Sequence, residues 1–154
     1  MKLLVIDTSY TLEDIVKKKL HQAIYSRDLN GYFTKVWSVH PFASLVTSKK
    51  WSKKYGSARK FNLNKKHTFI EGKIGKYYFL LFLTFINFLI SQIEIFFLLK
   101  KIILKERVDF IKSGDPLYNS ILAYILSKIT KVPFLVRVSG NFDKIYKDTK
   151  KPIM

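Results

Sequence analysis

The 154-residue chain has no cysteine, little glycine and few acidic residues. Without cysteine it forms neither a disulfide nor a thiolate metal site, and this absence fits a reducing cytoplasm. Its histidines, His21, His40 and His67, are far apart, and no pair has the spacing of metal ligands. None of the 6 glycines builds the Gly-x-Gly-x-x-Gly fingerprint of dinucleotide-binding proteins. We therefore expect no metal centre and no bound cofactor.

The shortage of acidic residues leaves a large positive charge, because 28 Lys and Arg residues face 11 Asp and Glu residues for a net charge of +17. Such an excess favours an anionic partner: a membrane surface, a nucleic acid or a phosphate-bearing substrate. Lysine pairs and aromatic residues alternate in a long basic excursion over residues 40–66. This pattern suits single-stranded nucleic acid and an anionic membrane equally well. The chain carries no nucleic-acid-binding fold signature, so nucleic acid is the less favoured partner, and a merely solvated basic loop is a third alternative.

Short apolar runs alternate with segments of helical periodicity, which predicts an α/β fold. We expect one Rossmann-like three-layer domain over residues 1–154, with a mostly parallel sheet. The expected strands cover residues 3–6, 32–39, 67–72, 108–111 and 134–138, and the expected helices cover residues 12–24, 77–104 and 117–130.

The segment 77–104 is the most apolar part of the chain, with no charge from Tyr77 to Ile93. Its length is sufficient to span a bilayer, although Glu94 would be costly in lipid. Four polar residues spaced three or four apart share one helical face: Thr84, Asn87, Ser91 and Glu94. A buried or groove-lining helix, an interfacial membrane helix and a true span all remain open.

In a fold of this class, ligands bind at the carboxyl ends of the parallel strands. Polar residues and glycine follow several of the expected strands. The candidate substrate-binding residues are Thr8, Ser9, Tyr10, His40, Asp115, Arg137, Ser139, Gly140 and Asn141.

Structural roles compete with ligand binding at several of these positions. The loop after the first strand is equally explained as a plain turn with Asp7 or Thr11 as a helix cap, and Asp115 is a plausible cap for the helix after Pro116. A buried Arg137 would need a carboxylate or a phosphate. That partner is either an acidic side chain, with Asp115 or Asp143 as candidates, or an anion in the crevice.

The last predicted elements have two further features: Asp115-Pro116-Leu117-Tyr118 opens a helix, and residues 136–141, Val-Arg-Val-Ser-Gly-Asn, close a strand. In these features and in the order of its elements, the chain resembles the N-terminal domain of family 4 glycosyltransferases, which have the GT-B fold. Similar sequences often have a histidine after that strand, where this chain has Ser139, Gly140 and Asn141. No catalytic residue is therefore assigned.

The resemblance implies that this chain is the acceptor-binding half of a glycosyltransferase, which transfers a sugar from a nucleotide sugar to a glycan or lipid-linked acceptor without a bound metal. No second Rossmann-like unit and no glutamate pair follow residue 141. We therefore expect the donor-binding domain to be absent or on a separate chain, and this chain to be inactive alone. It would work in the cytoplasm, at the inner face of the membrane. The alternatives are a basic protein that binds membrane surfaces or nucleic acid, and a non-functional truncated remnant.

Overall fold

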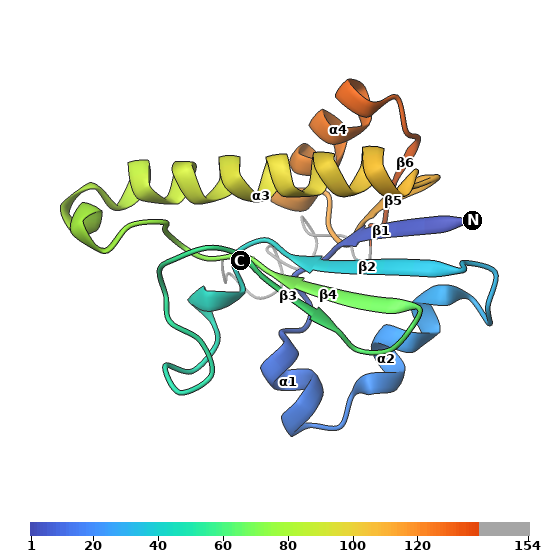
Figure 1. The fold of residues 1–154 in the computed structure, drawn as a ribbon, viewed down its shortest axis with the longest axis horizontal. Helices are drawn as coiled ribbons and strands as arrows, with labels where there is room; N and C mark the ends of the chain where they lie inside the picture. The colour runs from blue at the N-terminus through green and yellow to red at the C-terminus, as the bar shows by residue number, and fades with distance from the viewer. Residues whose placement is uncertain (139–154) are drawn as a thin grey trace, which may run out of the picture.

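A single six-stranded sheet lies between two helical layers in the computed structural model, which describes residues 1–138 (Figure 1). The predicted α/β, Rossmann-like three-layer fold is confirmed. The strands follow the order β3-β4-β2-β1-β5-β6, and only β3 runs antiparallel to its neighbour. Their bounds are β1 Lys2–Ile6, β2 Lys35–His40, β3 Arg59–Asn62, β4 His67–Glu71, β5 Phe110–Ser113 and β6 Phe134–Val136.

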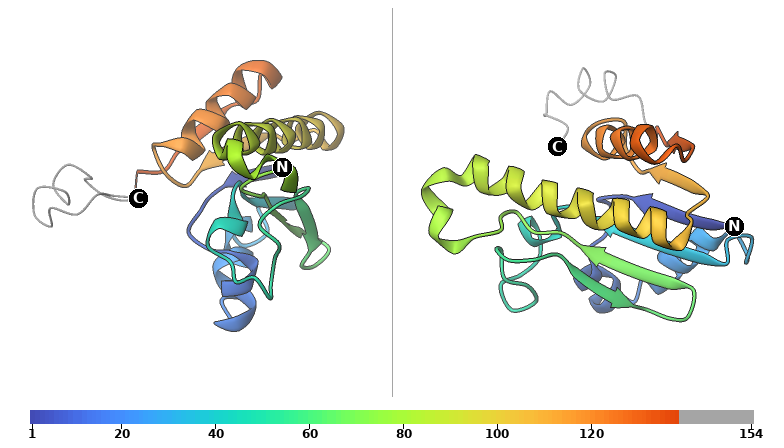
Figure 2. Two further views of the ribbon diagram at one scale, coloured as in Figure 1. Left: turned by 90° about the vertical axis from the view of Figure 1, so that its left-hand side faces the viewer. Right: turned by 45° about the horizontal axis from the view of Figure 1, so that its top comes forward.

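The helices divide between the two faces of the sheet, as Figures 1 and 2 show. Helices α3 and α4 cover one face, and α1 and α2 lie against the other. The helical elements are α1 Leu12–Lys17, α2 His21–Tyr25, η1 Ser26–Asp28, η2 Ala43–Leu45, η3 Tyr78–Leu83, α3 Thr84–Glu106 and α4 Tyr118–Thr130.

The central strand β1 is apolar on both faces, as expected for a parallel strand between two layers. Leu4 and Ile6 belong to the large core beneath α3 and α4. Leu3 and Val5 point to the opposite face and pack with Phe33. Because β1 pairs with β2 on one side and with β5 on the other, the direction of the strand order reverses beside it. In open α/β sheets this reversal creates the crevice in which ligands bind.

Two local predictions were wrong. The helix predicted over residues 12–24 is split into α1 and α2, because Lys19 adopts a left-handed backbone conformation with φ of 53°. The excursion 40–66 contains an unpredicted strand, β3, which forms an antiparallel hairpin with β4. Phe61 is the one apolar residue of β3, so the hydrophobic pattern gave no strand signal there.

Helix α3 has opposite polarity in its two halves. In its first half the buried side chains are polar: Asn87, Ser91 and Gln92. Asn87 accepts hydrogen bonds from the backbone N–H groups of Lys76 (2.6 Å) and Tyr77 (2.9 Å), and Ser91 donates to the carbonyl of Lys73 (2.6 Å). In the second half the buried residues are apolar and belong to the core: Ile95, Leu99, Ile102 and Ile103.

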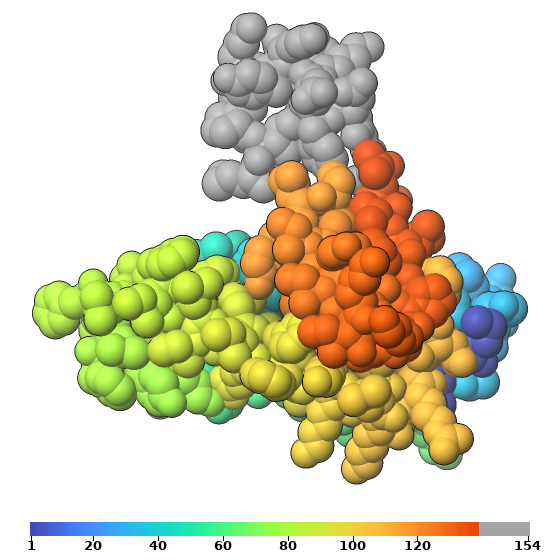
Figure 3. All heavy atoms as spheres, turned by 90° about the horizontal axis from the view of Figure 1, so that it is seen from above, coloured from blue at the N-terminus to red at the C-terminus, as the bar shows by residue number. Residues whose placement is uncertain are grey.

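The apolar side chains of the first half therefore face solvent. We call residues 77–89, which comprise η3 and the start of α3, the apolar arm. The arm extends past the carboxyl edge of the sheet, and its Phe82 side chain is 98% exposed (Figures 1 and 3). The segment Tyr78–Glu106 is long and apolar enough to cross a membrane by length and composition. In this fold, however, its second half is a core helix, and only the arm is free of the sheet.

We expect Asn87→Ala to destabilise the protein by about 2 kcal/mol, because two backbone donors of the turn before η3 lose their acceptor. Ile86→Ala is the matched control, since this adjacent side chain is exposed and its loss should change the free energy of unfolding by less than about 0.5 kcal/mol. Urea denaturation measures both variants. Equal effects of the two substitutions would contradict the anchoring role of Asn87.

Candidate functional site

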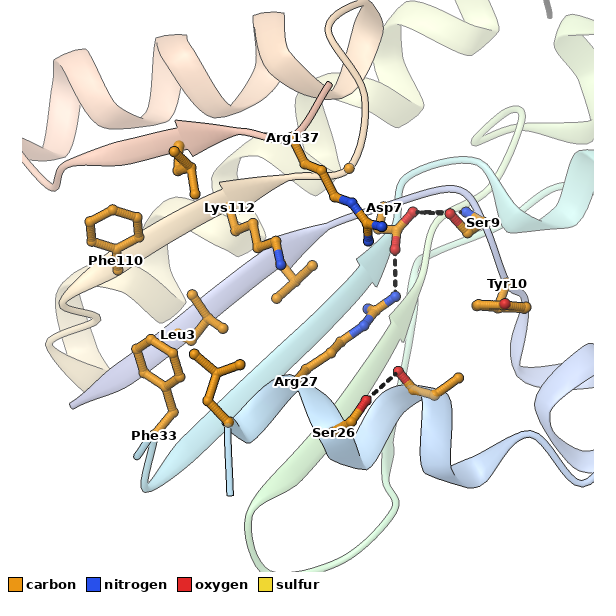
Figure 4. A pocket seen from close by; sticks show the side chains of 15 residues that line it. Leu3, Asp7, Ser9, Tyr10, Ser26, Arg27, Phe33, Phe110, Lys112 and Arg137 are labelled. Atoms are coloured by element: carbon orange, nitrogen blue, oxygen red, sulfur yellow. Dashed lines mark hydrogen bonds and ion pairs between the residues drawn. The ribbon is translucent and has the colours of Figure 1, made fainter. Parts of the chain in front are cut away.

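A cavity of about 580 Å³ opens on the α1/α2 face of the sheet, over β1, β5 and β6 (Figure 4). We call it the edge pocket. Side chains of these strands alternate between faces, so every second residue lines the pocket. Leu3 lies beside Phe110, and Lys112 lies between Val5 and Leu135. The pocket is apolar towards the amino ends of the strands. It becomes polar at their carboxyl ends, where Asp7, Ser9 and Arg137 line it.

Asp7, directly after β1, is the single carboxylate of the pocket lining. Its Oδ1 atom accepts hydrogen bonds from the backbone N–H and the hydroxyl of Ser9, at 2.9 and 2.6 Å. Its Oδ2 atom pairs with the Arg27 guanidinium of η1 at 2.5 Å. Burial opposes ionisation of this carboxyl, but Arg27 and the Ser9 hydrogen bonds outweigh it and hold the pKa of Asp7 below its ordinary value. Asp7 is therefore ionised and fully partnered at neutral pH.

Gly114 allows β5 to end against this carboxylate. A Cβ atom at residue 114 would lie 2.6 Å from Oδ1 of Asp7, closer than real Cβ atoms come to any neighbour. Glycine is thus required here for close approach.

Three cationic side chains line the pocket: Arg27, Lys112 and Arg137. The Arg27 side chain is only 12% exposed, and its burial lowers the pKa of the guanidinium despite the charge of Asp7. Within residues 1–138, neither Lys112 nor Arg137 makes an ion pair. Figure 4 shows the Arg137 side chain directed towards Asp7 from the β6 side.

The structure brings several predicted site residues together at this edge. Ser9 and Tyr10 line the pocket, as does Arg137. Thr8 and Asp115 meet through Asn119, whose side-chain amide donates to Asp115 and lies 3.4 Å from the Thr8 hydroxyl.

Only one of the two expected helix caps is realised, the one at Thr11: the N-cap residue of α4 is Leu117, with no capping hydrogen bond from a side chain, so Asp115 does not cap that helix. Oδ1 of Asp115 accepts a hydrogen bond from the backbone N–H of Leu117 (2.9 Å), just before α4. Thr11 caps α1 in a capping box with Asp14.

His40 lies at the end of β2 but is only 1% exposed and does not line the pocket. Burial lowers the pKa of His40 to about 4, although the charge of Asp7 partly opposes the shift. The imidazole is therefore neutral at pH 7. Ser139, Gly140 and Asn141 lie outside the described residues.

The prediction of a buried Arg137 was wrong. Strand β6 ends at Val136, and Arg137 is exposed. It forms no ion pair with Asp115, and Asp143 lies outside the described part of the chain. β6 is the edge strand of the sheet, and α1 and α2 do not extend over it, so its polar end stays open.

Sequence reasoning missed Arg27 and Lys112. A signal for Lys112 existed, because in β5 it alternates with Ile111 and therefore shares a face with Phe110. Arg27 had no such signal, since only the tertiary fold brings η1 to the end of β1. In the described part of the chain, no three His, Asp or Glu side chains cluster as a metal site. The pocket has the chemistry of a binding site for anionic and hydroxyl groups.

The structure is similar to two crystal structures of the C-terminal domain of a hydrogenase from Pyrococcus furiosus. One has a TM-score of 0.51 at 15% sequence identity and covers 88% of this chain and 90% of that chain. The other has a TM-score of 0.47 at 15% identity, with coverage of 89% and 90%. No protein-family model and no curated protein matches the chain. At this identity the likeness shows the fold alone.

The lowered pKa of His40 predicts a loss of stability in mild acid. The unfolded chain binds a proton near pH 6.5, whereas the folded chain binds it only near pH 4, so stability is complete above about pH 6.5 and falls as the pH drops towards 4. Between pH 7 and 5, the wild type should lose about 2 kcal/mol more than His40→Gln.

Urea denaturation at the two pH values measures this difference. His67 also has a lowered pKa and acts with the same sign, but it is present in both proteins and cancels. Parallel pH profiles would contradict a buried neutral His40.

Proposed function

We propose that this chain is the acceptor-binding half of a GT-B glycosyltransferase, which transfers a sugar from a nucleotide sugar to a glycan or lipid-linked acceptor. One observation carries the proposal: polar residues from separate segments converge on one pocket beside the point where the strand order reverses. Ser9 and Tyr10 come from the first loop, and Arg137 comes from the end of β6.

The chemistry of this edge supports an acceptor with hydroxyl groups. Sugar hydroxyls both donate and accept hydrogen bonds, so a sugar site needs carboxylates, hydroxyls and amides. Asp115, Thr8 and the amide of Asn119 provide these groups in one hydrogen-bonded cluster after β1 and β5, and Ser9 provides a hydroxyl inside the pocket. Catalysis also needs a bound nucleotide sugar. We place the donor site for this sugar on a second domain, which is a separate chain if the enzyme is split.

A glycan array tests this proposal directly. The purified chain should bind a subset of printed neutral or anionic oligosaccharides, yet release no UDP or GDP from UDP-glucose or GDP-mannose. Asp115→Asn keeps the acceptor for the Leu117 N–H but removes the charge, and should weaken glycan binding about tenfold. Asp109→Asn, just before the amino end of β5, removes the same charge at the opposite edge of the sheet; it is the matched control and should bind normally. A folded chain that binds no glycan, or that turns over alone, would refute the proposal.

The apolar arm favours a second candidate function, attachment to an anionic membrane surface. A large exposed apolar patch marks an interaction site with a protein or a membrane. Residues 49–56 of the basic excursion form a lysine-rich loop that lies beside the arm. Tyr55 packs on Tyr78 at a ring distance of 5.1 Å, and the Gly56 N–H donates to the Gly75 carbonyl. The exposed lysines of this loop are Lys49, Lys50, Lys53 and Lys54.

Charge and apolar surface thus occur together, which is the combination that binds anionic bilayers peripherally. The tyrosines of the arm suit the interface between headgroups and acyl chains. Such attachment would hold the protein at the cytoplasmic face of a membrane, with the carboxyl edge of the sheet near lipid-linked acceptors.

Sedimentation with lipid vesicles tests membrane attachment. The vesicles contain roughly 30% phosphatidylserine, so that their surface is anionic like that of the cytoplasmic leaflet. We expect binding that weakens steeply with salt, and Phe82→Asp should reduce the bound fraction about tenfold. Tyr32→Asp carries the same charge change at an exposed aromatic residue outside the arm and should behave as wild type. Equal losses in both variants would show that charge alone, and not the arm, governs binding.

A further inference from the structure

We propose that the edge pocket binds a phosphate group carried on an apolar chain. The inference rests on the proposed function in one respect, because it takes the edge pocket as the acceptor site and names the acceptor class as a lipid phosphate. Its physical basis is that one cavity combines an apolar sheet surface with two cations that have no ion-pair partner among residues 1–138.

The charge balance at the polar end calls for an anion. Both oxygens of Asp7 are already occupied, Oδ1 by Ser9 and Oδ2 by Arg27. Lys112 and Arg137 consequently face the cavity without a carboxylate of their own among residues 1–138. A phosphate group has enough oxygen atoms to bind both Lys112 and Arg137, and a guanidinium binds phosphate in a bidentate manner. A neutral sugar would offer these two cations no ionic partner, and the described residues offer none either.

The position of Lys112 is the most specific feature. Its cross-strand neighbours on the pocket face are Val5 and Leu135, both apolar. Lys112 is half-buried as a residue, and a charged side chain in an apolar row is unfavourable unless it has a partner. Leucine or valine would serve the fold better at this position, so the lysine points to a ligand.

The remainder of the cavity calls for an apolar group. Beyond Lys112 the sheet surface continues to Leu3 and Phe110, and Phe33 closes the far end. The volume of about 580 Å³ lies within the range of small-molecule sites, and a phosphate fills only a small part of it. Sugar hydroxyls would find no partners against this surface, whereas an alkyl or prenyl chain would bury it.

Dodecyl phosphate, used as a monomer below its critical micelle concentration, tests the pocket without a bilayer. Isothermal titration calorimetry should give an affinity at least tenfold tighter than that of inorganic phosphate or of dodecyl maltoside, which has the same chain and a neutral head. Lys112→Gln and Arg137→Gln should each weaken dodecyl phosphate binding about tenfold. Lys60→Gln, on the opposite edge strand β3, is the matched control and should bind as wild type.

The comparison compounds separate the alternatives. Equal affinity for inorganic phosphate would reduce the pocket to a free-phosphate site, and equal affinity for dodecyl maltoside would reduce it to an apolar groove; either result overturns the inference. Phe82→Asp should leave dodecyl phosphate binding intact, and a loss would assign the binding to the apolar arm instead. Glycan binding without dodecyl phosphate binding refutes this inference alone, whereas the reverse result supports it and refutes the proposed glycan site.

Discussion

The ion pair between Asp7 and Arg27 holds together the carboxyl edge of the sheet. Asp7 ends the central strand, and through its two oxygens it fixes the loop at Ser9 and the short helix η1. The same carboxylate sets the distance at which Gly114 can approach from β5. Because both partners are largely buried, loss of either would leave an uncompensated charge, which is far more costly than loss of a surface pair. The edge pocket therefore has a rigid polar end, built before any ligand arrives.

The two halves of helix α3 lie in different environments. Its second half supplies apolar side chains to the core, as an ordinary amphipathic helix does. Its first half buries Asn87 and Ser91 against the backbone of the preceding segment and turns its apolar side outward. The same helix thus anchors the arm to the domain and presents an apolar surface at the carboxyl edge. The polar end of the edge pocket lies at the same carboxyl edge, on the face of the sheet that α1 and α2 cover.

The sequence predicted the layers well and the site in part. Apolar runs such as 3–6 were sufficient for the parallel sheet, because strands buried on both faces lack polar interruptions. The break at Lys19 and the strand β3 were not predictable from periodicity, since a left-handed residue and a one-sided edge strand leave no strong pattern. The loop residue Ser9 follows from the rule for strand ends. Arg27 does not, because its place depends on how η1 packs.

The apolar arm also changes how molecules of this protein meet one another. In water, two arms can bury their apolar side chains against each other, and the principal force that opposes this contact is the repulsion between chains that each carry a charge of +17. That repulsion reaches about 10 Å at 0.1 M salt but only about 3 Å at 1 M. The positive charge of the chain is therefore also what keeps its molecules apart in solution, and concentrated salt removes that protection.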